Sequence, residues 1–212
     1  MNEKHGWANP SPAGLVALAV ACLTFSALFG GKISPGGLGL MGCWLFGGFI
    51  IQIVVAVIEL KEGKTTGGNV FLFFSAFFML TGALEMFLKY FAFINRWPME
   101  AHVDGYAWAV LSIILLFYTI AYLRESPLVM NILVLMLDVA VFLIATMDLG
   151  WIAAATFKPI ISNLLLVATG VTIYLSSAIL LNTSFGRAVM PLGKPLMAPQ
   201  INPVAKVALT DA

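Results

Sequence analysis

The chain has 212 residues, of which 61% are hydrophobic and only 10% are charged, and its mean hydropathy is +0.99. A soluble domain carries about 25% charged residues, so this composition excludes an ordinary soluble protein and predicts a membrane protein. The formal net charge of +1 offers no bulk attraction for nucleic acid.

The sequence offers little material for a metal site or a catalytic centre. It contains two histidines and two cysteines. Cys22 and Cys43 both fall inside apolar runs, so we expect them to pack as small side chains rather than to form a disulfide or bind a metal. A hydrolase needs a nucleophile beside a base, and no such pairing is visible. We therefore expect no metal, no cofactor and no enzymatic activity.

Six apolar stretches follow one another along the chain, and each is long enough to cross a bilayer as a helix. Short segments rich in charged residues, glycine or proline separate them. The predicted spans are residues 13–30, 38–60, 69–93, 105–123, 128–149 and 160–181. The fold class predicted is therefore an all-α membrane protein with six transmembrane helices.

The spans form one transport-sized domain, residues 13–187, between a polar head at residues 1–12 and a proline-containing tail at residues 188–212. We expect the tail to be extended or disordered because its prolines prevent a continuous helix. With six spans, both termini lie on one side of the membrane. That side collects Lys4, Lys61, Lys64, Arg124, Arg187, Lys194 and Lys206. This bias predicts a multi-pass protein of the cell membrane with both termini in the cytoplasm.

Polar side chains inside the spans are costly in lipid and therefore informative. Gln52 lies near the middle of the second span, and Glu59 lies seven residues later on the same helical face. Glu59 is also close to the cytoplasmic end of that span, where solvation alone would explain it. Asp138 lies deep in the fifth span, where a charge is costly unless it is paired. For Asp138 the sequence leaves open a proton-active site or a neutral or partnered structural group.

Glu85 and Lys89 stand four residues apart in the third span, on one helical face. The spacing predicts a structural ion pair near the outer boundary of the membrane. Several spans carry faces with both small and polar residues, and such faces indicate a route for a small polar solute. A route for an ion would need more charge than these faces carry.

Residues 9–15, Asn-Pro-Ser-Pro-Ala-Gly-Leu, lie where the polar head gives way to the first span. Pro10 and Pro12 restrict the backbone, and Pro12 suits a first helical turn. Asn9 is a candidate helix cap, and Gly14 permits a close approach of another backbone or a ligand. Alone, the stretch is typical of an ordinary loop-to-helix junction.

Two further stretches change its meaning. A Gln-x6-Glu-x-Lys-x-Gly-x-Thr-x-Gly pattern is formed by Gln52, Glu59, Lys61, Gly63, Thr65 and Gly67. Residues 182–193 read Asn-Thr-Ser-Phe-Gly-Arg-Ala-Val-Met-Pro-Leu-Gly. Together the three stretches resemble the signatures of the acetate uptake transporter family. The first family signature reads Asn-Pro-Ala-Pro-Leu-Gly-Leu, and Ser11 and Ala13 depart from it.

The resemblance implies six helices around a narrow central pore in each protomer, and a ring of six protomers. It implies transport of acetate, and in some members succinate or other small carboxylates, coupled to protons. It also implies an apolar constriction, which counting from the motifs assigns to Leu18, to Phe74 and to a position near Leu137. Relatives carry Phe and Tyr at the first two positions, so we expect a wider gate that lacks a hydroxyl group.

Polar groups on either side of such a constriction would bind the carboxylate in partly hydrated form. The candidate substrate-binding positions are Asn9, Gly14 with the amides that follow it, Thr24 or Ser26, and Gln52. The candidates for carrying a proton are Asp138 and Glu59.

Two other functional classes stay open. A channel for urea, an amide or ammonia would also suit a polar pore, because six-helix hexamers of similar size conduct neutral solutes. A membrane scaffold or sensor that transports nothing is the third class. The expected partners are a small carboxylate such as acetate, the lipid bilayer and further copies of the chain in a homo-hexamer, with no nucleic acid. The sequence does not separate a channel from a proton symporter.

Overall fold

The structure is a computed structural model that describes residues 6–100 and 102–197. The far end of the predicted tail, with Pro199 and Pro203, and the basic residues Lys4 and Lys206 lie outside the described residues. The α-helices are α1 (Ser11–Phe29), α2 (Leu38–Lys61), α3 (Thr65–Phe73), α4 (Thr81–Asn95), α5 (His102–Glu125), α6 (Leu128–Asp148) and α7 (Ala154–Phe185). A 3-10 turn, η1 (Pro35–Gly37), precedes α2, and a π-helical segment, η2 (Phe74–Leu80), joins α3 to α4.

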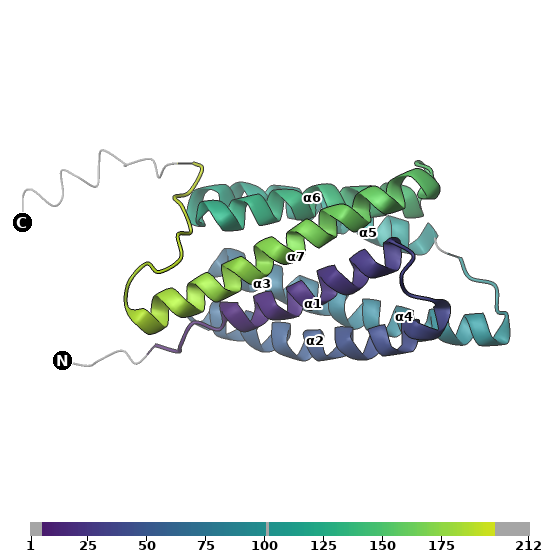
Figure 1. Cartoon of the computed structure of the whole chain (residues 1–212), viewed down its shortest axis with the longest axis horizontal. Coiled ribbons are helices and arrows are strands. Elements are labelled where there is room, and N and C mark those ends of the chain that lie inside the picture. Colours follow the sequence, from purple (N-terminus) through teal and green to yellow (C-terminus); the bar gives the residue numbers. More distant parts are fainter. Residues whose placement is uncertain (1–5, 101, 198–212) are drawn as a thin grey trace, which may run out of the picture.

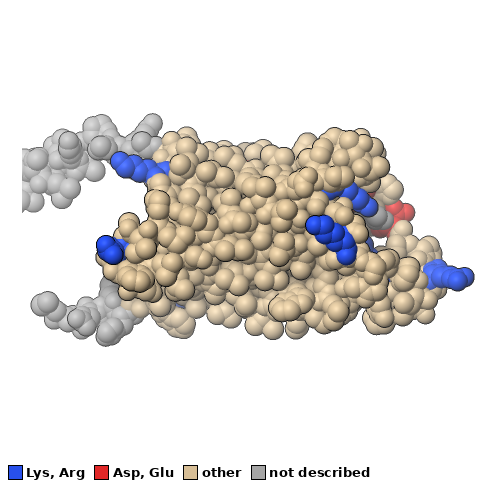
Figure 2. Space-filling view, in the orientation of Figure 1, with Lys and Arg blue, Asp and Glu red and all other residues tan. Residues whose placement is uncertain are grey.

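The prediction of six spans is confirmed, because α3, η2 and α4 continue one another as a single span from Thr65 to Asn95. All six spans are long and apolar enough to cross a membrane. Figure 1 shows them running along the long axis of the molecule. On the face shown in Figure 2, lysine and arginine lie toward both ends and acidic residues toward the right-hand end, with an uncharged belt between them. Such a belt fits the hydrocarbon layer of a bilayer.

The last helix begins earlier than predicted. α7 starts at Ala154, inside the stretch that the sequence indicated as a connection, and Pro159 lies within the helix. A proline this close to a helix start removes few backbone hydrogen bonds, so the helix continues through it. The prediction that the span begins at residue 160 therefore placed its start too late in the chain.

α1 packs between α2 and α7. Two hydroxyl groups tie it to α7 through reciprocal bonds: Ser26 Oγ donates to the Ser162 carbonyl and Ser162 Oγ to the Ser26 carbonyl, each at 2.7 Å. Cys22 is buried in this core, as predicted, whereas Cys43 is exposed on the outer surface of α2. The expectation that Cys43 packs inside was wrong because its helical face points away from the bundle.

The start of α1 differs in one detail from the prediction. Pro12 lies in the first turn, as predicted, but the N-cap residue is Pro10 and no side chain caps the helix. The prediction that Asn9 is the cap was therefore wrong, because Asn9 precedes the cap position. Its Oδ1 atom instead accepts a hydrogen bond from the Ser11 backbone N–H at 3.2 Å.

The described part of the tail, residues 188–197, is not helical, as predicted, but it is anchored to the bundle. Asn182 near the end of α7 accepts hydrogen bonds from the Val189 and Met190 backbone N–H groups at 2.7 and 2.9 Å, and its Nδ2 donates to the Met190 carbonyl. The Leu192 carbonyl accepts a hydrogen bond from the Val129 N–H on α6 at 3.1 Å. The third sequence stretch therefore folds back from the end of α7 to the start of α6.

Gly105 generates a test of this packing, because it lets the start of α5 approach the end of α6. A Cβ at this position would lie 2.7 Å from the Leu149 backbone nitrogen. We expect Gly105→Ala to lower the stability by about 1–3 kcal/mol, since backbone atoms must shift to make room. Gly47→Ala is the matched control, because nothing lies within 4 Å of a Cβ there. Thermal unfolding in detergent should show a lower transition for Gly105→Ala alone, and equal transitions would contradict the close approach.

Candidate functional site

Three cavities follow one another through the bundle. The first, which we call the vestibule, has a volume of about 490 Å³ and lies where α1 begins and α2 ends. The middle cavity has about 40 Å³ and the far cavity about 100 Å³. Each neighbouring pair shares lining residues, so the cavities form one row.

The vestibule and the middle cavity meet at Phe71, Tyr122 and Met130, which line both. Phe71 packs directly on α1 at Gly14, where a Cβ would lie 2.6 Å from the Phe71 ring. The absence of a side chain at Gly14 therefore lets the Phe71 ring pack against α1. In the structure, Gly14 makes room for this ring beside the row of cavities.

The middle and far cavities meet at Leu18, Phe74 and Leu137, which line both. These side chains come from α1, η2 and α6, and each is buried, with 8% of its surface exposed. The three positions that the sequence assigned to a constriction therefore lie together, at the boundary between two cavities. The π-helical geometry of η2 belongs to this boundary, because Phe74 is its first residue.

Gln52 lines the middle cavity and is almost fully buried. Its Nε2 atom is 3.5 Å from the Gly14 carbonyl oxygen, at the long limit of a hydrogen bond. Its Oε1 atom has no hydrogen-bond partner among the described residues. Rotating the amide by 180° would set two acceptors against each other, so this orientation leaves Oε1 as a free acceptor.

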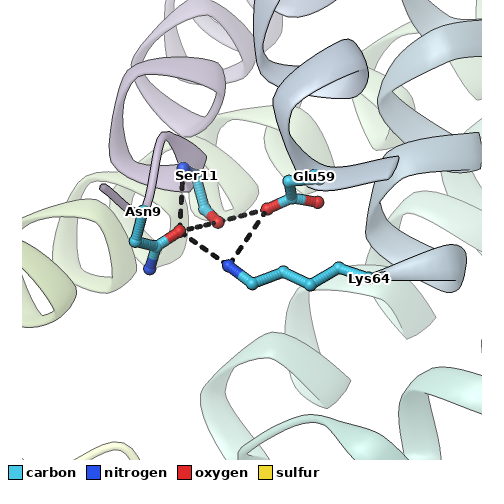
Figure 3. A network of polar contacts seen from close by, with 4 residues as sticks. All are labelled: Asn9, Ser11, Glu59 and Lys64. Carbon is cyan, nitrogen blue, oxygen red and sulfur yellow. Dashed lines mark hydrogen bonds and ion pairs between the residues drawn. The ribbon is translucent and has the colours of Figure 1, made fainter. Parts of the chain in front are cut away.

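A polar network at the edge of the vestibule joins the first two sequence stretches (Figure 3). The Ser11 hydroxyl lies within hydrogen-bond reach of both Asn9 Oδ1 and Glu59 Oε1, and its one proton serves one of them at a time. Lys64 Nζ donates to Asn9 Oδ1 at 3.0 Å and lies 3.9 Å from Glu59 Oε1.

Glu59 is held inside this network rather than in solvent. Its side chain is only 4% exposed, so the interpretation that it is simply solvated was wrong. Gly67 leaves room for the Glu59 carboxylate, because a Cβ at position 67 would collide with Glu59 Oε2. The spacing of Glu59, Lys64 and Gly67 thus reflects one compact arrangement at the junction of α2 and α3.

Two other candidates lie away from the cavities. Thr24 Oγ1 donates to the Ala21 carbonyl of its own helix at 3.0 Å, and Thr24 lines none of the three cavities. Ser26 is occupied by α7, as described above. Asp138 is buried but also lines none of the three cavities, and its polar neighbour is Thr119 of α5. Its oxygens make no hydrogen bond with the described residues.

The far cavity holds charged residues that the sequence placed only in part. The predicted contact between Glu85 and Lys89 is confirmed, and both residues line this cavity. Asp104 of α5 lies 3.8 Å from Lys89 Nζ, and Asp148 of α6 also lines the cavity. Helical spacing revealed the pair on α4, but it could not reveal carboxylates on two other helices. The boundary that Phe71, Tyr122 and Met130 form between the vestibule and the middle cavity was missed for the same reason.

The network around Glu59 gives a direct prediction. Ser11→Ala removes the hydroxyl donor from a nearly buried carboxylate, and we expect a loss of about 1–3 kcal/mol in stability. Thr24→Val removes a hydroxyl from the same helix at a position that only bonds its own backbone, so it should change stability much less. Melting temperatures of the two purified variants in detergent provide the comparison. A larger loss in Thr24→Val would mean that Ser11 does not support Glu59.

No family model matches the chain. The chain is 26% identical over 190 residues to the succinate-acetate/proton symporter SatP of Escherichia coli K12, in an alignment that covers 88% of this chain and 96% of that protein. The same protein from Escherichia coli O157:H7 and from Shigella flexneri gives identical values. A solved structure of the bacterial acetate channel SatP matches with a TM-score of 0.75 and 25% identity, over 88% of this chain and 99% of that one. The chain is thus similar to SatP in sequence and fold over most of both chains, which supports the resemblance to the acetate uptake transporter family that the three sequence stretches carry.

Proposed function

We propose that this chain carries acetate across the membrane through the row of three cavities in each protomer. The observation that carries the proposal is the row itself: two sets of three shared lining residues connect the cavities. The SatP relatives, named for acetate, support the choice of substrate. Leu18, Phe74 and Leu137 act as the constriction in this proposal.

The chemistry of acetate fits an apolar constriction only in part. Its methyl group is favoured there, but a charged carboxylate loses hydration that no side chain at Leu18, Phe74 or Leu137 replaces. Acetic acid loses far less hydration free energy in the same passage, because it is neutral. The substrate therefore crosses this boundary as the acid, and a proton moves with it.

Gln52 supports this view of the middle cavity. Its Oε1 atom, which has no partner in the described part of the chain, can only accept a hydrogen bond. Acetate has no donor to offer, whereas acetic acid presents one O–H group. Gln52 is thus a substrate-binding residue that favours the protonated form next to the constriction.

The vestibule, in contrast to the middle cavity, favours the charged carboxylate form of the substrate. Lys64 lines the vestibule and Asn9 lies beside it, and the Lys64 ammonium group attracts anions. Glu59 lines the vestibule beside them and is the better placed of the two proton candidates. Asp138, which lines none of the three cavities, acts as a structural group between α5 and α6 in this proposal.

The orientation and assembly of the chain are part of the proposal. The bias of basic residues puts both termini in the cytoplasm, so the vestibule opens inward and the far cavity outward. The exposed apolar residues of the helices serve contacts with lipid and with further protomers in a hexamer. Leu at position 18 leaves a wider constriction than Phe would, and this width admits small dicarboxylates such as succinate.

A channel for a neutral solute is the second candidate, because the N–H groups of urea or ammonia would also satisfy Gln52 Oε1. Proteoliposomes loaded with the purified protein separate the two. We expect labelled acetate to enter well above the rate of empty liposomes and to saturate, with labelled urea at the background rate. Urea entry without acetate entry would replace the proposal by its alternative, and background rates for both would indicate a scaffold or sensor.

Leu18→Phe tests the width of the constriction. The larger ring should lower succinate flux about tenfold while lowering acetate flux less than about threefold, because the longer acid needs more room. Leu23→Phe on the exposed face of the same helix is the matched control and should change neither flux. Equal factors for succinate and acetate in Leu18→Phe would show that Leu18 does not select by size.

A further inference from the structure

The far cavity has an apolar body and one charged end. Its body is formed by residues such as Phe25, Ile144 and Leu165, together with the Leu18–Phe74–Leu137 boundary. Glu85, Lys89 and Asp148 line its other end. A small carboxylate has the same division into an apolar part and a charged part.

Lys89 carries the only positive charge among the described residues that line this cavity. Within the described part of the chain, its ammonium group donates one hydrogen bond, to Glu85. Asp104 at 3.8 Å is near enough for an ion pair but too far for a hydrogen bond. An ammonium group has three N–H donors, so two remain available for a ligand. The side chain is also 35% exposed, so a ligand in the cavity can reach it.

The carboxylates around Lys89 decide where an anion can bind. Glu85, Asp104 and Asp148 come from three different helices and would each repel an incoming carboxylate. Lys158 interacts with Asp148 but does not line the cavity. Among the described lining residues, Lys89 is therefore the one positively charged group that an anion entering the far cavity meets.

We propose that Lys89 binds the carboxylate of the substrate at the far end of the route, and that Glu85 occupies this site while it is empty. The inference rests on the proposed function, and it adds a substrate site to it. The substrate carboxylate takes the place of the Glu85 carboxylate at Lys89 Nζ. Its apolar end then points toward Leu18, Phe74 and Leu137.

Replacing Glu85 by the substrate carboxylate at Lys89 has a low free-energy cost for two reasons. Glu85 and Lys89 lie one turn apart on α4, so the pair opens by side-chain rotation without moving the backbone. One charge-assisted hydrogen bond replaces another, and the partly buried ammonium group stays paired throughout. Glu85 thus acts as an internal competitor that sets how tightly the substrate binds.

Competition predicts opposite effects for the two members of the pair. Lys89→Gln removes the binding group and should raise the half-saturating acetate concentration about tenfold. Glu85→Gln removes the competitor and should lower it about threefold. The double variant should resemble Lys89→Gln, because the competitor has no role once the lysine is gone. Lys32→Gln, an exposed lysine that does not line the far cavity, is the control and should leave the value unchanged.

The experiment is equilibrium exchange of labelled acetate in proteoliposomes, over a range of concentrations that are equal on both sides. This design makes the half-saturating concentration independent of how the protein is oriented. An unchanged value in Lys89→Gln, or a raised value in Glu85→Gln, would overturn the inference. A purely structural pair predicts that both single variants lose stability and that the double variant recovers it.

The two proposals fail in distinguishable ways. Absence of acetate exchange by the unaltered protein would contradict the proposed function itself. Normal exchange by the unaltered protein, with no shift in Lys89→Gln, would contradict only the substrate site at Lys89. If Lys89→Gln does not assemble, Glu85→Gln still decides, because competition alone predicts tighter binding in that variant.

Discussion

One face of α1 lines the row of cavities from end to end. Ser11 borders the vestibule, Leu15 the middle cavity, Leu18 the boundary, and Cys22 and Phe25 the far cavity. These residues recur every three or four positions, so a straight helix presents all of them to the same side. The opposite side of α1 must be fixed by another helix so that this face keeps pointing toward the cavities.

α7 provides that support. The reciprocal bonds of Ser26 and Ser162 fix the far end of α1, and Ser176 Oγ donates to the Pro12 carbonyl at 2.9 Å near its start. Gly14 then allows Phe71 to close on the other side. The hydroxyl groups of Ser26, Ser162 and Ser176 thus lock α1 to α7.

Charge is distributed along the route in a way that suits a substrate with two protonation states. Lys64 and Glu59 lie at one end, and Lys89 with its carboxylates lies at the other. Between them the linings are mostly apolar, and Gln52 and Tyr122 are the residues of the middle cavity that carry polar side-chain groups. In the proposed function, one lysine at each end binds the anion, and the apolar linings between them favour the neutral acid. A row of this kind needs no fixed charge at its narrowest point.

The sequence predicted the parts of this arrangement that depend on local order. Apolar length gave the six spans, and helical spacing gave the contact between Glu85 and Lys89. Counting from the family motifs assigned Leu18, Phe74 and Leu137, which lie on three different elements yet line the same boundary. Periodicity alone would not have joined them.

Other features depend on which helices become neighbours, and they could not be predicted. Thr24 has the residue type of a ligand contact, but its helical face points away from the cavities. Asp104 and Asp148 join Lys89 only because the start of α5 and the end of α6 lie beside α4. Asp138 is deep in its span, as predicted, but it faces Thr119 rather than the row of cavities.

The central claim is that the substrate passes between the middle and far cavities at Leu18. It is tested by placing a single cysteine at position 18, in a chain whose Cys22 and Cys43 are replaced by serine, and measuring acetate flux before and after complete labelling with a small thiol reagent. The account predicts that labelling at position 18 abolishes most of the flux, while the same label at position 23, on the exposed face of α1, has no effect. Unchanged flux after labelling at position 18, with full modification verified by mass spectrometry, would contradict it.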